Sequence, residues 1–404
     1  MLHNVKVLSF THFLQGPSAV QFLADMGADV IKIESPKGAY ERHWSGVNAF
    51  LNEESVFYLL AGRNQRSLSL DIRTDEGKEI VYNMIRDTDV IVENFRPGVM
   101  ERLGFGYEDV LKINPSIIYA SFSGFGSTGP YRDRPGQDLL LQAMSGLASL
   151  NGRKDQPPTL VGSAIIDQHA AVLGALGIVG ALFERQITGN GKKVESNLLN
   201  AALDLQIEPF NYYLNGFNLY DRSESGISSR FHQAPYGIFE TQNGYICLSL
   251  TPTVKLASVF DDEKFLEWTK NDQFEKREEI NARTVQHLKK NTTEYWYELF
   301  KANEIWCSFV NDYEQVESDP QVEWNKCILS FDHPTAGKVR LLSHPVQYNG
   351  ETLELRKSPP KLGEHTEEIL KDLGYDQETI KEYSQKGFIR TINNMSSKNA
   401  NHSK

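Results

Sequence analysis

The amino-acid sequence predicts an α/β fold: an open, doubly wound, Rossmann-like large domain with a smaller α+β domain. Short apolar strands alternate with helices through the first third of the 404-residue chain. After about residue 216 the sequence changes to a hairpin pattern and charged helices. A chain of this length also exceeds the size at which single hydrophobic cores stop growing, so more than one domain is expected.

The alternation begins at the N-terminus. Lys6–Phe10 has the composition of a short buried strand, and a helix is predicted from about Gly16 to Gly27 because apolar residues recur at helical spacing. Asp29–Glu34 is the next predicted strand. Strands that are joined through helices run parallel, and helices then cover both faces of the sheet.

The same pattern continues along the chain. Further helices are predicted over residues 75–86, 107–113, 138–150 and 167–185, and further strands over 89–93 and 117–122. The last of these helices is rich in Ala and Gly, which predicts close packing against a neighbouring element.

The second part of the chain has a different character. Residues 236–250 indicate two strands joined by an Asn-Gly turn, charged helices follow to about residue 315, and a last helix begins near Glu364. The predicted domains are a large domain of residues 1–205 completed by 330–390, a small domain of residues 220–330, and a disordered polar tail of residues 393–404.

Composition excludes several classes of partner. The formal net charge of -11 argues against nucleic acid, because binding its phosphates needs a basic face. The longest apolar region, 170–183, is interrupted by glycines, so we expect no membrane partner. The sequence begins without a secretory pattern, which predicts a cytoplasmic protein. Its three cysteines are too scattered for a metal site, so no metal is expected.

Common cofactor and hydrolase motifs are missing from the sequence. Glu34 ends the second strand, where an acid often holds a ribose, but the preceding turn, Thr11-His-Phe-Leu-Gln-Gly-Pro, lacks the G-x-G-x-x-G of dinucleotide sites. The G-x-S-x-G, H-E-x-x-H and P-loop signatures are absent too. These motifs therefore do not define the activity.

Four longer segments carry a family resemblance. They are Gly27-Ala-Asp-Val-Ile-Lys-Ile-Glu, Val90-Ile-Val-Glu-Asn-Phe-Arg-Pro-Gly, Gly189-Asn-Gly-Lys-Lys-Val and Gly363-Glu-His-Thr. In these segments the chain resembles class III CoA-transferases, the CaiB/BaiF family. The resemblance implies an interlocked homodimer that moves CoA from an acyl-CoA thioester to a free carboxylic acid. Coenzyme A is then a substrate, and no tightly bound cofactor is expected.

The resemblance also implies a nucleophile. In Gly162-Ser-Ala-Ile-Ile-Asp-Gln the family's catalytic aspartate falls on Asp167. A carboxylate attacks a thioester to give a mixed anhydride, and the released CoA thiolate converts this anhydride into an aspartyl-CoA thioester. Without the resemblance, Asp167 would be interpreted as an ordinary helix N-cap.

The CoA site is likewise implied by the resemblance. Segments that meet the thiol end fall on His12, Phe13, Leu14 and Gln15, and those that hold the nucleotide and phosphates fall on Leu70, Arg73, Asn94, Phe95, Arg96 and Arg102. Lys37 substitutes for a basic residue that some members place where this chain has Ser35, and Arg134 is a further contact to pantetheine or phosphate. The alternative for each arginine is a solvated surface charge.

A second carboxylate, Asp138, and one departure from the family bear on the type of reaction. Asp138 either orients the substrate and raises the pKa of a neighbouring carboxyl or caps the following helix. The racemase branch of the family carries Gly-His-Asp where this chain has Gly136-Gln-Asp, and glutamine is no acid or base. Transfer is therefore preferred over two alternatives, a 2-methylacyl-CoA racemase and a non-catalytic acyl-CoA-binding protein.

Overall fold

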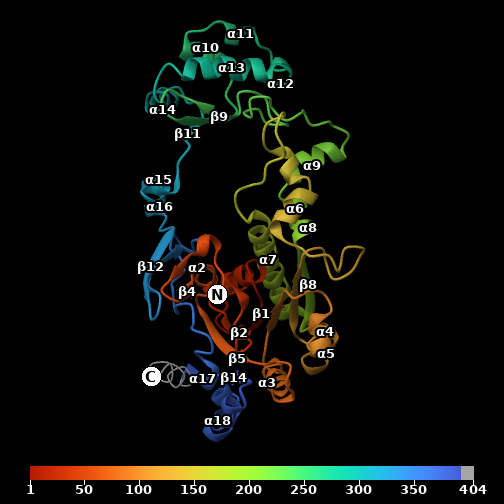
Figure 1. Cartoon of the computed structure of the whole chain (residues 1–404). Coiled ribbons are helices and arrows are strands. Elements are labelled where there is room, and N and C mark those ends of the chain that lie inside the picture. The colour runs from red at the N-terminus through yellow and green to blue at the C-terminus, as the bar shows by residue number, and fades with distance from the viewer. Residues whose placement is uncertain (393–404) are drawn as a thin grey trace. The chain divides into compact units, whose positions relative to one another are not determined.

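The computed structural model describes residues 1–392, which fall into two compact units. The first comprises residues 1–141, 164–202 and the described residues from 321 onward, and the second comprises 142–163 and 203–320. The predicted tail, 393–404, lies outside the described residues. Figure 1 shows the elements in chain order.

The first unit contains a seven-stranded sheet in the order β14-β5-β2-β1-β6-β7-β8. Its strands are β1 (Lys6–Phe10), β2 (Asp29–Glu34), β5 (Gln65–Leu70), β6 (Val90–Glu93), β7 (Ile118–Ser123), β8 (Lys192–Asn197) and β14 (Ile389–Arg390). All pairs are parallel except the one between β14 and β5. The predicted α/β class and its parallel sheet are therefore confirmed.

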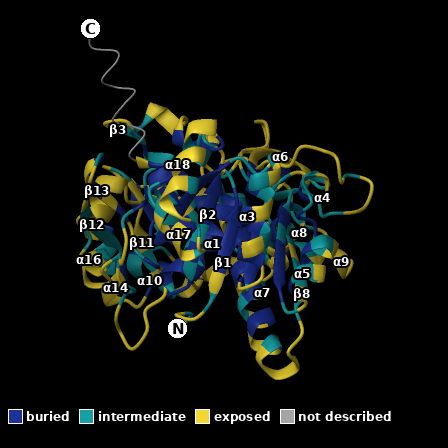
Figure 2. Ribbon diagram, turned by 90° about the horizontal axis from the view of Figure 1, so that it is seen from below, coloured by how far each residue is buried: buried dark blue, intermediate teal, exposed yellow. Residues whose placement is uncertain are grey.

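Alternating side chains divide the core of the first unit between the two faces of the sheet. Along β1, Leu8 and Phe10 enter one apolar cluster while Val7 enters the other. Helices α1 (Gln15–Asp25) and α7 (Ile165–Thr188) cover the face of Val7. Helices α3 (Asp75–Ile85), α5 (Tyr107–Ile113), α17 (Thr366–Asp372) and α18 (Gln377–Lys386) cover the other face. The strands lie buried between these layers (Figure 2).

Helix α7 is long and apolar enough, by length and composition, to cross a membrane. The helix predicted over 167–185 is confirmed, and the three glycines of the apolar region continue it. Gly174 allows close packing: a methyl group there would lie 2.2 Å from Cε1 of Phe122, a residue of β7. The buried Ala and Gly residues of α7 therefore pack on the sheet and on α1, as the composition predicted.

The second unit has a smaller antiparallel sheet. Strands β9 (Gly237–Glu240) and β10 (Tyr245–Leu248) form the predicted hairpin, and β11 (Cys307–Phe309) pairs with β10. Phe239, Trp296 and Phe300 belong to its apolar core. Its helices are α9 (Ile207–Leu214), α10 (Thr253–Phe260), α11 (Lys264–Glu267), α12 (Asp272–Glu275), α13 (Arg277–Leu288), α14 (Thr293–Ala302) and α15 (Tyr313–Glu317).

Two differences from the expected organisation follow from contacts that are distant in sequence. Residues 142–163, placed in the large domain by the sequence analysis, group with the second unit. The reason is their hydrogen bonding, since Arg222 donates to the carbonyl of Gln156 at 2.8 Å and Lys154 N donates to that of Ser223 at 2.9 Å. The helix predicted over 138–150 also divides at Gly146, whose φ of +92° separates two shorter helices.

The remaining elements are short. They are β3 (Phe50–Leu51), β4 (Glu54–Ser55), α2 (Val56–Leu59), α4 (Val99–Leu103), α6 (Asp138–Met144), α8 (Leu198–Asp204), α16 (Pro320–Trp324), β12 (Ile328–His333) and β13 (Gly337–Leu342), with 3₁₀ turns at Tyr40–Arg42, Gly46–Asn48 and Leu147–Leu150. Strands β12 and β13 form an antiparallel hairpin.

Candidate active site

The sheet of the first unit changes its direction of progression between β1 and β6. From β1 the chain proceeds through β2 and β5 on one side, and from β6 through β7 and β8 on the other. In open parallel sheets the crevice at the carboxyl ends of two such strands is the usual place for a ligand. The loops that follow β1 and β6 are therefore where the candidate site begins.

Asn94 joins these two loops. Its Oδ1 accepts a hydrogen bond from the backbone amide of His12, and its Nδ2 donates to the carbonyl of the same residue, both at 2.7 Å. The ring of His12 lies edge-on to that of Phe95, with centroids 4.9 Å apart. Burial and the charge of Lys32 lower the pKa of His12, so its imidazole is neutral at pH 7.

A buried ion pair supports the turn between β1 and α1. Lys32 Nζ donates to the carbonyl of Thr11 at 2.8 Å and to Oε1 of Glu41 at 2.9 Å. The other carboxylate oxygen of Glu41 accepts from the amide of Phe13 at 3.3 Å. Phe13 has a φ of +60°, which is unusual for a residue with a Cβ, so the pair holds a strained turn in place.

Sequence reasoning missed both residues of this pair. A lysine in the middle of the otherwise apolar strand 29–34 was the only available signal, because a buried lysine requires a partner. The partner, Glu41, lies in a segment without a recognisable motif. A small cavity beside this turn is lined by Phe13, Pro17, Lys32, Glu41, Phe57, Tyr58, Ala61 and Gly62.

Asp167 lies in the first turn of α7, and Asp138 caps that turn. One oxygen of Asp138 accepts from the backbone amides of Ile166 at 2.7 Å and Asp167 at 3.0 Å. The N-cap position belongs to Ala164, so Asp167 itself is not the cap that sequence alone would suggest. Burial and the negative charge of Asp138 raise the pKa of Asp167 to about 7.

The first turns of α1 and α7 are in contact. Nε2 of Gln168 donates to Oγ of Ser18 at 3.2 Å. Gln15 lies three residues before Ser18 on α1 and is only 7% exposed. Among the described residues its Nε2 has no hydrogen-bond partner. An unsatisfied buried donor is costly, so this amide is available to a ligand that enters the site.

The basic residues suggested by the sequence are not equally available. Arg73 forms an exposed pair with Asp71 at 2.6 Å, and Leu70 contributes its side chain to the core. Arg96 and Arg102 follow β6, while Arg134 lies on the loop after β7 with its guanidinium 3.8 Å from the ring centroid of Tyr131. Leu14 is buried at the start of α1, and Lys37 is exposed.

Glu34 is not a ribose ligand in this structure. Both of its carboxylate oxygens bind the guanidinium of Arg42, at 2.6 and 2.7 Å, and the pair is buried. Arg42 also donates to the hydroxyl of Tyr58 at 2.7 Å. The acid at the end of β2 therefore stabilises the fold and offers no free oxygen for a nucleoside.

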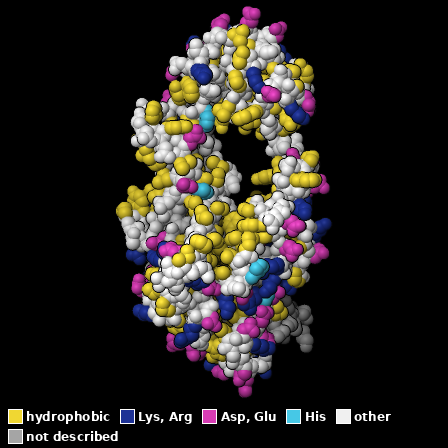
Figure 3. Space-filling model, turned by 180° about the vertical axis from the view of Figure 1, so that it is seen from behind, with side chains coloured by type: hydrophobic (Ala, Val, Ile, Leu, Met, Phe, Trp, Pro, Cys, Tyr) yellow, Lys and Arg dark blue, Asp and Glu magenta, His cyan; other side chains and the backbone are white. Residues whose placement is uncertain are grey.

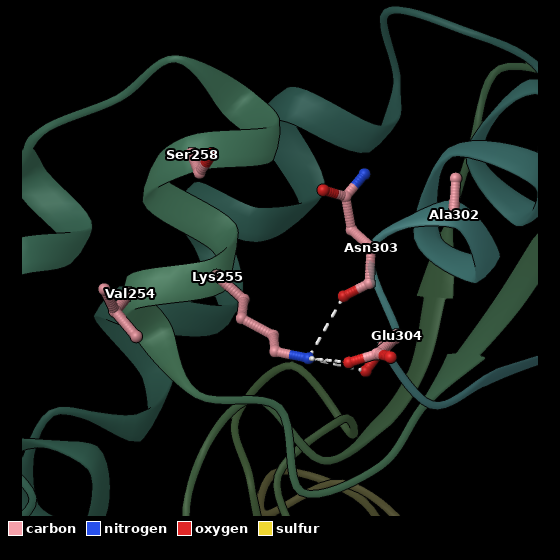
Figure 4. Close-up of a pocket in the computed structure, with 6 residues that line it drawn as sticks. All are labelled: Val254, Lys255, Ser258, Ala302, Asn303 and Glu304. Carbon is pink, nitrogen blue, oxygen red and sulfur yellow. Dashed lines mark hydrogen bonds and ion pairs between the residues drawn. The ribbon is translucent and has the colours of Figure 1, made fainter.

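The second unit has a separate surface cavity of about 360 Å³ (Figure 4). It is lined by Val254, Lys255, Ser258, Ala302, Asn303 and Glu304. Lys255 Nζ donates to the carbonyls of Asn303 and Glu304 at 3.1 and 2.8 Å. These two backbone acceptors lie directly after α14. None of the candidate catalytic residues lines this cavity.

The chain belongs to CoA-transferase family III, whose family model matches residues 2–366. It is 33% identical to succinyl-CoA:glutarate CoA-transferase of Mus musculus over 96% of this chain and 90% of that protein. It is 31% identical to formyl-CoA:oxalate CoA-transferase of Rhodopseudomonas palustris over 96% of both. A CaiB/BaiF family protein from Brucella suis has a similar structure, with a TM-score of 0.78 and 28% identity over 92% and 99% of the two chains. The predicted family is confirmed, and its function is CoA transfer.

Proposed function

We propose that this chain transfers CoA between carboxylic acids with Asp167 as the covalent nucleophile. The observation that carries the proposal is the position of Asp167: it lies in the first turn of α7, which contacts the first turn of α1, and its pKa is raised to about 7. A carboxyl group with this pKa is half ionised at neutral pH and is less stabilised by solvent than an exposed aspartate.

The proposed reaction conserves the thioester bond energy. The Asp167 carboxylate attacks the acyl carbon of the thioester, which forms a mixed anhydride and releases the CoA thiolate. The thiolate attacks the aspartyl carbonyl, so that the first acid leaves and an aspartyl-CoA thioester remains. The carboxylate of the second acid attacks this thioester, which forms a second mixed anhydride and releases the CoA thiolate. The thiolate then attacks the acyl carbon of the second acid, which gives the new acyl-CoA and frees Asp167.

Gln15 supplies a hydrogen-bond donor for these steps. Its unpartnered Nε2 lies on the turn of α1 that precedes the Ser18–Gln168 contact, so it is on the side of α1 that meets the start of α7. A donor aimed at the oxyanion of a tetrahedral intermediate typically contributes about 10²–10³ in rate. Asp138 positions Asp167 through the backbone, and Gln137 beside it replaces the histidine of the racemase branch with a side chain that is no acid or base, which favours transfer.

The covalent intermediate provides the direct test. We expect intact-protein and peptide mass spectrometry after incubation with succinyl-, glutaryl-, formyl- and oxalyl-CoA to show an acyl or CoA adduct on the Asp167 peptide. Their acyl groups are those of the acids in the names of the two related CoA-transferases. Asp167→Ala should show no adduct, while Asp109→Ala, which removes an exposed aspartate paired with Lys112, should react like the wild type. Adducts on another residue would overturn the assignment.

The raised pKa of Asp167 predicts the pH dependence. Because the carboxylate and not the acid is the nucleophile, kcat/KM should fall about tenfold per pH unit below pH 7. Burial also raises the pKa of Glu93 to about 7, so a second variant must assign the inflection. Asp138→Asn removes the charge next to Asp167 and should move the inflection to lower pH. An inflection near the ordinary aspartate pKa of about 4 would contradict the prediction.

We also propose a homodimer, interlocked as the resemblance implies. Hydrophobic side chains are visible at the surface in Figure 3. On α7, the exposed hydrophobic residues Val172, Leu176, Phe183 and Ile187 recur at helical spacing on the side away from the sheet. A row of this kind supports an interface with a second copy of the chain.

A further inference from the structure

Two arginine side chains converge on one glycine beyond the carboxyl ends of β6 and β7. Gly98 follows β6, Arg102 lies in α4 directly after it, and Arg132 lies on the loop after β7. A methyl group added at Gly98 would lie 3.0 Å from Nη1 of Arg102 and 3.3 Å from Nη2 of Arg132. The two guanidinium groups therefore approach the same point from two neighbouring loops.

No acidic side chain within residues 1–392 forms an ion pair with either guanidinium group. Two positive charges that approach the same point repel each other, and an anion between them would remove this repulsion. Other arginines of the first unit contrast with this pair: Arg42, Arg63 and Arg66 each bind a carboxylate at 2.5–2.6 Å. Within residues 1–392, the two arginines at Gly98 therefore lack the ion-pair partner that those three arginines have.

We propose that Arg132 and Arg102 together bind a phosphate group of the CoA ester across Gly98. The identity of the ligand rests on the proposed function. Two forked guanidinium groups offer paired N–H donors that match the oxygens of a phosphate, which is the geometry of strong charge-assisted hydrogen bonds. The missing side chain at Gly98 keeps open the space between the two groups, and its φ of +87° favours glycine at this position.

Arg132 is a binding residue that the family motif did not indicate. The arginines suggested by the sequence, among them Arg102 and Arg134, lie in or beside recognisable segments, whereas Arg132 lies two residues before Arg134 and outside them. The parallel pairing of β6 and β7 places the two loops at the same edge of the sheet. This proximity depends on tertiary structure, so spacing along the chain does not reveal it.

Binding measurements with fragments of CoA test the clamp. We expect Arg132→Gln to weaken CoA binding at least tenfold in titration calorimetry and to leave pantetheine, which has no phosphate, unchanged. Arg86→Gln is the matched control, since Arg86 is an exposed arginine at the end of α3, ahead of β6 rather than after it. Wild-type affinity for CoA in Arg132→Gln, or equal losses for CoA and pantetheine, would overturn the proposal.

A third ligand distinguishes which phosphate is bound. If Arg132→Gln loses affinity for 3′-dephospho-CoA by the same factor as for CoA, the clamp holds the pyrophosphate. If 3′-dephospho-CoA is insensitive to the substitution, the clamp holds the 3′-phosphate. Both outcomes support the clamp. The measurement requires no turnover, so the clamp can succeed while the Asp167 adduct fails, and the reverse is equally observable.

Discussion

Replacing Asp167 with asparagine is expected to lower kcat for CoA transfer by about 10³-fold or more. The amide has nearly the same shape as the carboxylate but cannot attack a thioester carbon, so the mixed anhydride does not form. Steady-state transfer of CoA from succinyl-CoA to a dicarboxylic acid provides the measurement. Gln168→Ala, which changes the next residue and removes only the contact with Ser18, is the control and should retain much more activity.

The same substitution should not unfold the protein. The folded-state pKa of Asp167 is about 7, against an ordinary value of 3.8, so the folded chain holds a proton that the unfolded chain has lost between these pH values. Stability from this group is complete below about pH 4 and is lost as pH rises through 7. The asparagine side chain cannot ionise, so Asp167→Asn should be at least as stable as the wild type at about pH 8. If Asp167→Asn transfers CoA at more than about a tenth of the wild-type rate, the assignment of Asp167 as the nucleophile is contradicted.

Glu34→Gln is expected to lower the free energy of unfolding by about 3–5 kcal/mol, because it leaves the buried guanidinium of Arg42 without its counter-charge. Urea denaturation followed by circular dichroism measures the loss. Burial alone would raise the pKa of Glu34, but Arg42 outweighs it and holds the pKa well below 4.5. The stabilisation is therefore present above pH 4.5 and decreases as pH falls below that value.

Asp71→Asn is the matched control for the buried pair. It removes an ion pair with Arg73 whose guanidinium side chain is 75% exposed, and such pairs contribute about 0–1 kcal/mol. A loss in Glu34→Gln no larger than the loss in this control would show that the Glu34–Arg42 pair contributes little to stability.

The elements that sequence predicted best are those with strong local patterns. Strands β1 and β2 match their predicted bounds, because short apolar runs between turn residues define a buried strand. The prediction of one continuous helix over 138–150 was wrong, and residues 142–163 group with the second unit and not with the large domain. These depend on a turn at Gly146 and on hydrogen bonds to Ser223 and Arg222, which lie far along the chain.

The candidate site shows the same division. The family motif implies Asp167, but the hydrogen bond from its backbone amide to Asp138 joins residues that are 29 positions apart, and no local pattern indicates it. The Lys32–Glu41 pair has no motif, and Glu34 suggested a nucleotide contact although Arg42 occupies it. Sequence thus identifies residue types that are suited to the chemistry, whereas tertiary contacts decide which of them are free to perform it.

The reciprocal hydrogen bonds between Asn94 and His12 restrict how this family member can evolve. One side chain satisfies both a donor and an acceptor of the same residue, so an exclusively acidic or basic replacement would leave one backbone group of His12 unpaired. The junction of β1 and β6 is therefore expected to stay the same while the loops around it vary.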